Sequence, residues 1–222
     1  MKVIISLLLA VLAAIVATVL SEVGQAGGAD MPAYSGHLQA KIEYCEDCHG
    51  SSGRGYVGFL IMPRLAGQTT SYLESQLRAF VERTRDRDLF INMAKTHSLS
   101  PEMQTAVATH FQGANARPFG GAPRYLMAAG KKIYEQGVPE ANVPACVACH
   151  GPEAKGQEAN PRLAGQLYPY IKTRLMNWRK ERSQESANAP IMVRIARNMT
   201  GSQIAAVAAY LSGLKEFGSA RT

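Results

Sequence analysis

The chain has 222 residues, a formal net charge of +7 and a hydrophobic fraction of 46%, which is enough for two small packed domains or one larger domain. A basic protein could bind nucleic acid, an anionic membrane surface or an acidic protein. The two basic clusters, Arg83–Arg87 and Arg179–Arg182, contain acidic residues and no aromatic residues. They are typical of solvated helix faces, and we therefore exclude nucleic acid as a partner.

The N-terminus begins with Met1-Lys2 and continues as an apolar run, Val3–Leu20. As a helix this run would span roughly 27 Å, close to the roughly 30 Å hydrocarbon core of a bilayer. It is longer than the apolar region of a usual cleaved export signal, and a cleavage site is present only loosely near Gly24-Gln25-Ala26. We predict that residues 1–25 form a single N-terminal hydrophobic helix that anchors the protein in the membrane. The alternative is an export signal whose cleavage leaves a soluble periplasmic protein.

The remainder of the chain is an internal duplication. Cys45–Gly50 matches Cys146–Gly151, and Pro63–Gln68 is identical to Pro161–Gln166. The matches keep the same order at offsets of 98 to 101 residues, which chance does not explain and which indicates two homologous domains.

A stretch rich in glycine and proline separates the two halves. It is typical of a linker. We therefore predict a first domain at 26–112, a linker at 113–123 and a second domain at 124–222.

Each half is predicted to be helical, which gives an all-α fold class. Apolar residues recur at helical spacing in a middle helix of each half, and no segment shows the alternation of a strand. The final helix of the first half is predicted to begin after an N-cap at Ser100, and its counterpart after a capping box that opens at Thr200.

The strongest chemical signal is the pair of Cys-x-x-Cys-His motifs, Cys45-Glu-Asp-Cys48-His49 and Cys146-Val-Ala-Cys149-His150. This spacing is typical of covalent haem c attachment, in which the two sulfurs bind the haem vinyl groups and the histidine is an axial iron ligand. A zinc site would need paired knuckles closer together in the sequence, and a thioredoxin-like dithiol would need a βαβ context. We predict two covalently bound haem c groups, attached through Cys45, Cys48, Cys146 and Cys149 and ligated by His49 and His150.

The sixth iron ligand is predicted to be a methionine between the middle and final helices, because a thioether raises the potential as an electron carrier needs. In the second half Met192 and Met199 are candidates. Met199 aligns with Leu99 directly before the final helix, which indicates a packing role, so Met192 is the predicted ligand.

In the first half the predicted ligand is Met93, which lies one residue closer to the final helix than Met192 does in its own half. Met62 and Met103 are alternatives that fit packing better. His97 is a rival ligand that would lower the potential, although we favour for it a role at the edge of the core.

The Pro-Arg-Leu-Ala-Gly turns are predicted to complete the haem environment. A ligating histidine usually donates its other ring N–H to a carbonyl or carboxylate, and Pro63 and Pro161 follow the motifs at a distance suited to supplying one. Leu65 and Leu163 would pack on the haem.

The sequence resembles the cytochrome c4 family from about Ser35 to Leu214, on the two Cys-x-x-Cys-His-Gly motifs, the two Pro-Arg-Leu-Ala-Gly-Gln turns and the ordered duplication. The resemblance implies two tandem class I cytochrome c domains with His/Met ligation, the methionines being Met93 and Met192. It also implies electron transfer from a quinol-oxidising complex of bc1 type to a haem-copper terminal oxidase in a respiratory chain.

We therefore predict an electron carrier without substrate chemistry, anchored at the periplasmic side of the bacterial inner membrane. A dihaem enzyme such as a peroxidase, with one open haem, is the alternative. A fixed subunit of a respiratory complex would share the carrier's chemistry and differ in the stability of its partner contact.

Overall fold

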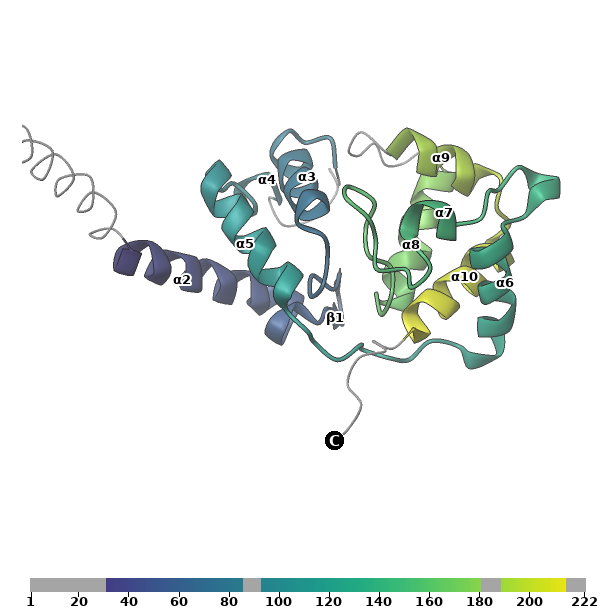
Figure 1. Ribbon diagram of the computed structural model, residues 1–222, viewed down its shortest axis with the longest axis horizontal. Coiled ribbons are helices and arrows are strands. Elements are labelled where there is room, and N and C mark those ends of the chain that lie inside the picture. The colour runs from purple at the N-terminus through teal and green to yellow at the C-terminus, as the bar shows by residue number, and fades with distance from the viewer. Residues whose placement is uncertain (1–30, 86–92, 181–188, 215–222) are drawn as a thin grey trace, which may run out of the picture. The chain divides into compact units, whose positions relative to one another are not determined.

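The computed structural model describes residues 31–85, 93–180 and 189–214 (Figure 1). Within these ranges every helix is too short or too polar to cross a bilayer. The apolar run Val3–Leu20 lies outside the described residues, so the N-terminal helix stays a prediction. Residues 1–40 and 41–222 form separate compact units, and the division of the second unit at 113–123 also stays a prediction.

The described residues are mostly helical, as the sequence predicts. The first half consists of α2 (Met31–His49), η1 (Ser51–Gly53), β1 (Tyr56–Val57), β2 (Ile61–Met62), α3 (Thr70–Val81), α4 (Met93–Thr96) and α5 (Pro101–Gly113). The second half consists of η2 (Arg124–Leu126), α6 (Met127–Gln136), η3 (Pro139–Ala141), α7 (Val147–His150), α8 (Tyr168–Arg179), α9 (Ala189–Arg197) and α10 (Gly201–Gly213).

The helix starts follow the predicted capping residues. The Ser100 hydroxyl accepts a hydrogen bond from the Met103 amide at the start of α5. At the start of α10, Thr200 and Gln203 form the reciprocal pair of a capping box. Both predictions are confirmed, because a cap is a local interaction that the sequence encodes within four residues.

The final helices α5 and α10 pack on the middle helices α3 and α8, and α10 also packs on α6 (Figure 1). Gly130 makes the α6–α10 crossing possible, since a Cβ there would lie only 2.0 Å from the carbonyl oxygen of Ala206. The apolar residues of α10 form much of the core of the second half, with Ile204, Val207, Ala208 and Leu211 at most 2% exposed.

The prediction that strands are absent is wrong for a short hairpin. Strands β1 and β2 pair antiparallel, with Tyr56 opposite Met62 and Val57 opposite Ile61. Twelve residues (51–62) separate the first haem motif from its turn, whereas nine (152–160) do so in the second half. The extra residues give the first half room for two paired strands.

Tyr134 ties the second haem motif to the core. Its ring is fully buried, and its hydroxyl donates to the carbonyl oxygen of Gly151 over 2.6 Å. Tyr134→Phe should lower the free energy of unfolding by about 1–3 kcal/mol, because the Gly151 carbonyl would remain buried without its donor. Denaturant unfolding of the haem-loaded protein measures this difference.

The same variant has an alkaline signature. Burial raises the pKa of Tyr134 above its ordinary value, so the hydroxyl stays neutral in the folded protein while it ionises in the unfolded chain. Its contribution to stability is therefore complete below about pH 10 and declines as the pH rises further. Tyr134→Phe should show a smaller stability loss above pH 10 than the parent, and an equal loss would contradict this assignment.

Candidate functional site

The two motif histidines have the same environment. His49 ends α2 and His150 ends α7. Their Nδ1 atoms lie 2.8 Å and 2.9 Å from the carbonyl oxygens of Pro63 and Pro161, respectively, which are the contacts expected from the sequence. With the proton on Nδ1 donated to a carbonyl, Nε2 carries the lone pair that a metal requires.

The ionisation of the motif residues also fits haem attachment. Burial lowers the pKa of His49 to about 4 and lowers that of His150, which keeps both rings neutral as metal ligands must be. Burial raises the pKa of Cys45 and of Cys146 to about 11, so before haem is attached these thiols are protonated at neutral pH.

The donor set of the described residues argues against a zinc site. None of the four cysteines is in a disulfide, so all four sulfurs are available for haem attachment. No group of three or more His, Cys, Asp or Glu side chains in the described part of the chain is arranged to hold a metal ion. Each histidine instead has its own pair of cysteines, as haem c requires.

Both motifs face one continuous cavity. It is lined by the cysteines and histidines of both motifs and, as the sequence predicts, by Pro63, Leu65, Pro161 and Leu163. The lining is mainly apolar, with buried arginines from the two turns. A large apolar cofactor with a few charged groups fits such a cavity.

The Pro-Arg-Leu-Ala-Gly turns have the same hydrogen bonds in the two halves. The amides of Leu65 and Ala66 donate to the carbonyl of Gly53, and those of Leu163 and Ala164 donate to the carbonyl of Ala154. The duplication is therefore preserved at the level of single backbone bonds, which hold each proline carbonyl in place beside its histidine.

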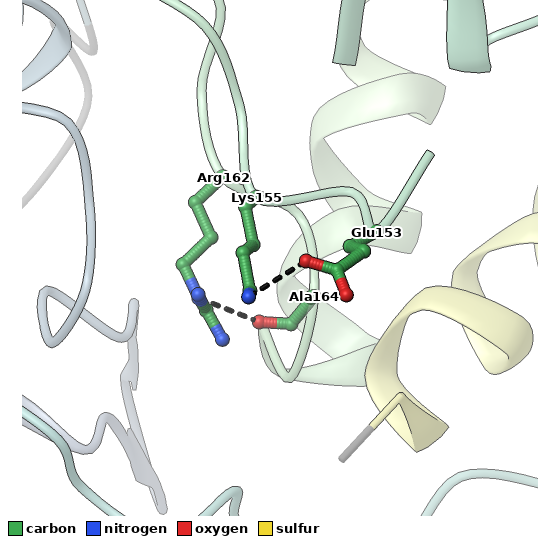
Figure 2. A network of polar contacts seen from close by, with 4 residues as sticks. All are labelled: Glu153, Lys155, Arg162 and Ala164. Atoms are coloured by element: carbon green, nitrogen blue, oxygen red, sulfur yellow. Dashed lines mark hydrogen bonds and ion pairs between the residues drawn. The ribbon is translucent and has the colours of Figure 1, made fainter. Parts of the chain in front are cut away.

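In each turn the arginine side chain also folds back and donates a hydrogen bond to a backbone carbonyl of the same turn. Arg162 Nε donates to the carbonyl oxygen of Ala164 over 3.1 Å, and the nearby Lys155 and Glu153 form an ion pair at 2.7 Å (Figure 2). Arg64 Nε makes the equivalent bond to Ala66 over 3.0 Å. The Lys155–Glu153 pair is exposed and contributes little to stability.

The turns meet through a reciprocal pair of glutamines. Gln166 accepts from the Arg64 amide over 2.8 Å and donates to the Arg64 carbonyl over 3.0 Å. Gln68 does the same with Arg162, over 2.7 Å and 3.1 Å. This contact was not predicted from the sequence, although the identity of Gln68 and Gln166 in the two repeats was a signal for it.

Removing a glutamine of this pair should loosen the contact between the halves. Gln166→Ala removes the acceptor of the Arg64 and Leu167 amides and the donor to the Arg64 carbonyl, in a buried place, which should cost about 2–4 kcal/mol. Denaturant unfolding measures the loss, and Gln136→Ala on the exposed end of α6 is the matched control. A loss no larger than that of the control would contradict the structural role.

The candidate sixth ligand of the second half lies in the cavity. Met192 on α9 is half-buried and lines it. Met199 also touches the cavity, but it is only 3% exposed and belongs to the hydrophobic core. This arrangement favours Met192 as the ligand.

The structure does not assign the sixth iron ligand of the first half. Met93 begins α4, but its side chain lies outside the described residues. His97 is half-buried and lines the cavity, and its ring stacks on Phe80 with a centroid distance of 4.3 Å. Met62 lines the cavity as well, from β2. Met93 therefore stays a prediction and His97 its rival.

Comparison with known proteins identifies the family. The cytochrome c family model matches residues 127–215. A cytochrome c4 of Thiocapsa roseopersicina is 34% identical over 175 residues, which cover 78% of this chain and 88% of that protein. The chain belongs to the cytochrome c4 family. The structure of Acidithiobacillus ferrooxidans cytochrome c4 is similar with a TM-score of 0.68 and 37% identity, over 78% of this chain and 99% of that one.

A further relative carries a different name. A protein of Stutzerimonas stutzeri named thiosulfate dehydrogenase electron acceptor is 34% identical over 214 residues, which cover 93% of this chain and 96% of that protein. The relatives of this chain thus include one that is named for a particular donor.

Family membership and the two motifs together establish the cofactor. The protein binds two haem c groups covalently, one through each Cys-x-x-Cys-His motif. It is a c-type cytochrome that exchanges electrons with partner redox proteins.

Proposed function

We propose that the protein carries electrons from a quinol-oxidising complex of bc1 type to a haem-copper terminal oxidase. The observation that carries this proposal is the single cavity shared by both Cys-x-x-Cys-His motifs. Haem c supplies a one-electron iron couple there. The glutamine contacts between the Arg64 and Arg162 turns support a fixed separation of the two sites, which electron transfer between them needs.

The roles of the ligands follow from their environments. His49 and His150 would each present Nε2 to iron, oriented by the carbonyls of Pro63 and Pro161. Met192 would be the sixth ligand of the second iron, and Met93 that of the first. Two six-coordinate irons favour electron transfer over substrate chemistry, because a peroxidase needs an iron with an open or displaceable coordination position and polar distal groups.

Carbon monoxide tests the carrier against the enzyme. The reduced native protein should not bind carbon monoxide rapidly at either haem, because both sixth positions are occupied. The absorbance change after mixing in a stopped-flow instrument measures binding. Rapid binding at one haem would contradict the pure carrier and support a dihaem enzyme.

A second candidate donor is a thiosulfate dehydrogenase. The observation that favours it is the relative named thiosulfate dehydrogenase electron acceptor, whose similarity extends over nearly the whole of both chains. This alternative keeps the carrier chemistry and changes only the protein that delivers the electron.

Reduction kinetics separate the two donors. The oxidised protein is mixed either with a bc1-type complex and quinol or with thiosulfate dehydrogenase and thiosulfate, and its haem absorbance is followed. Faster reduction by the bc1-type complex is expected. Reduction by thiosulfate dehydrogenase alone would assign the second donor, and oxygen consumption after adding a haem-copper oxidase tests the acceptor.

Ionic strength tests how the partners meet. The net charge of +7 would steer the protein to acidic partner surfaces, although haem propionates offset part of it. The rate of acceptor reduction should therefore fall as salt is added. A rate that does not change with ionic strength would remove the steering claim.

We also propose that residues 1–25 anchor the protein at the periplasmic face of the inner membrane. The length of the apolar run Val3–Leu20 supports this placement. The full chain should stay in alkali-washed membranes with its N-terminus intact, and a version with a cleavable signal in place of 1–25 should be released. Recovery of a shortened soluble protein from the full chain would show cleavage instead. If mild detergent releases the protein alone, a fixed-subunit role fails.

A further inference from the structure

The β1–β2 hairpin presents large apolar side chains to solvent. Phe59, at the turn, is 92% exposed, and Tyr56, Val57 and Ile61 are exposed as well. We call these four residues the hairpin surface. Side chains this exposed bury little apolar area and contribute little to folding. A single exposed apolar residue is ordinary, but four within six residues form a patch of the kind that a partner covers.

The hairpin surface adjoins the first haem site. Both ends of the hairpin are tied to His49, because the Gly55 amide donates to the His49 carbonyl over 2.7 Å and the Pro63 carbonyl lies 2.8 Å from His49 Nδ1. Ile61 and Met62 also line the haem cavity. A protein seated on the hairpin would therefore lie beside the first haem, where the path for an electron is short.

The second half has no such surface. The stretch between its haem motif and its turn, residues 152–160, contains alanine but no larger apolar residue, and it carries Glu153, Lys155 and Glu158. The short strands of the first half have no counterpart there among the described residues. The duplication therefore preserves the haem sites and gives only the first half an apolar surface at this position.

The charge beside the hairpin indicates what kind of partner fits. The hairpin itself, residues 56–62, has no charged residue. Glu46 and Asp47 stand between the two cysteines of the first motif, where the second motif has Val147 and Ala148. Residues 41–62 carry three acidic and two basic residues, so this region is slightly acidic in a protein of net charge +7. Such a surface complements an apolar face with a basic rim.

The same charges argue against two other occupants. Proteins that bind anionic membranes place lysine or arginine beside their apolar residues, and the hairpin has neither. In a two-fold dimer formed through the hairpins, equivalent surfaces would meet. Glu46 and Asp47 of the two copies would then approach each other.

We propose that the hairpin surface is the docking site for one of the two redox partners, a protein whose docking face has an apolar centre and a basic rim. One electron then passes between the first haem iron and the redox centre of this partner, with no bond made or broken. The proposal rests on the carrier function proposed above. The net charge of +7 steers the other partner, which is acidic, to a different face.

The first test is Phe59→Ser. Stopped-flow absorbance follows reduction of the oxidised protein by a bc1-type complex with quinol, and oxidation of the reduced protein by a haem-copper oxidase. The second-order rate constant of one reaction should fall about tenfold, as expected when an aromatic anchor at the centre of an interface is truncated. The other rate constant should not change. The proposal is overturned if neither rate constant falls or if both fall alike.

The matched control is Tyr125→Ser. Tyr125, in η2 of the second half, is an aromatic residue that is 85% exposed, and its replacement should change neither reaction. Phe59→Ser should leave reduction by ascorbate at the parent rate, because the haem itself is not altered. Slower reduction by ascorbate would place the effect at the haem and overturn the docking role.

Small charged oxidants test the acidic surface without either respiratory complex. Tris(phenanthroline)cobalt(III) combines aromatic ligands with positive charge, as the proposed partner does, whereas ferricyanide is negative. Replacing Glu46 with valine and Asp47 with alanine copies the second motif, which has these residues between its cysteines. At low salt this variant should lower the ratio of the cobalt rate to the ferricyanide rate about threefold or more. Taking the ratio removes any common effect of a changed potential.

The control for charge is the double replacement Glu140→Ala and Glu153→Ala, which changes the net charge equally in the second half. It should alter the ratio less than the motif variant does, and an equal effect would overturn the acidic docking surface. If the parent reacts with neither respiratory complex, the proposed function fails while the ratio still tests the surface.

The other two occupants have their own readouts. Binding to vesicles of phosphatidylglycerol and phosphatidylethanolamine that Phe59→Ser weakens would assign the hairpin to a membrane. A dimer in sedimentation velocity that Phe59→Ser dissociates would assign it to a second copy of the chain. Either result would overturn the proposal, and we expect Phe59→Ser to change neither.

Discussion

Replacing Met192 with histidine should lower the potential of the haem in the second half by on the order of 0.2 V, within the roughly 0.8 V range over which axial ligands set haem potentials. A thioether stabilises ferrous iron, whereas a second imidazole stabilises ferric iron. Met192 lies half-buried on α9 and lines the cavity, so an imidazole there would remain beside the iron. Spectroelectrochemistry gives the potential, and the weak red charge-transfer band of methionine-ligated ferric haem should lose about half its intensity.

Met199→Leu is the matched control for this prediction. Met199 belongs to the core and also touches the cavity, so its replacement tests whether a nearby thioether that does not bind iron matters. It should reduce stability slightly and leave both potentials and the charge-transfer band in place. If Met199→Leu removes the band and Met192→His does not, Met192 and Met199 have been assigned in the wrong order.

Local sequence patterns predicted much of the site. The contact of His49 with Pro63 and that of His150 with Pro161 span 14 and 11 residues, and the two identical turns pointed to both. Helix caps at Ser100 and Thr200 depend on residues within a single turn. Such interactions are readable because the residues that make them are neighbours in the chain or repeat as a unit.

Contacts between distant residues were not readable in the same way. The hydrogen bonds between Gln166 and Arg64 join residues 102 apart, and the sequence of either half alone does not show that its glutamine contacts the other half. The hairpin β1–β2 depends on a short insertion whose alternation is too brief to register as a strand. The unpaired N–H of Trp178 becomes visible only when the surroundings of the ring are known, because the sequence shows an aromatic at a core-like position and no more.

Sequence and structure leave two candidates, Met93 and His97, for the sixth iron ligand of the first half. Met93 begins α4 and His97 follows the end of that four-residue helix. Backbone positions four apart in a helix share a face, so position alone does not separate them. The His97 ring, however, is stacked on Phe80 with an interplanar angle of 21°, and a ring held in that stack would have to leave it or carry Phe80 along to approach iron.

Met93→Ala should therefore free the sixth coordination position of the first haem iron, whereas His97→Ala should not. Without its thioether the iron would have an exchangeable sixth position, and the reduced variant should bind about one carbon monoxide per chain within the mixing time while the parent binds none. His97→Ala removes the stacking contact with Phe80, worth about 0.5–1.5 kcal/mol, and should lower stability without admitting carbon monoxide. Carbon monoxide binding by His97→Ala but not by Met93→Ala would reverse the assignment. The first haem would then have two histidine ligands and a potential well below that of the second, so an electron shared between the two haems would favour the second half.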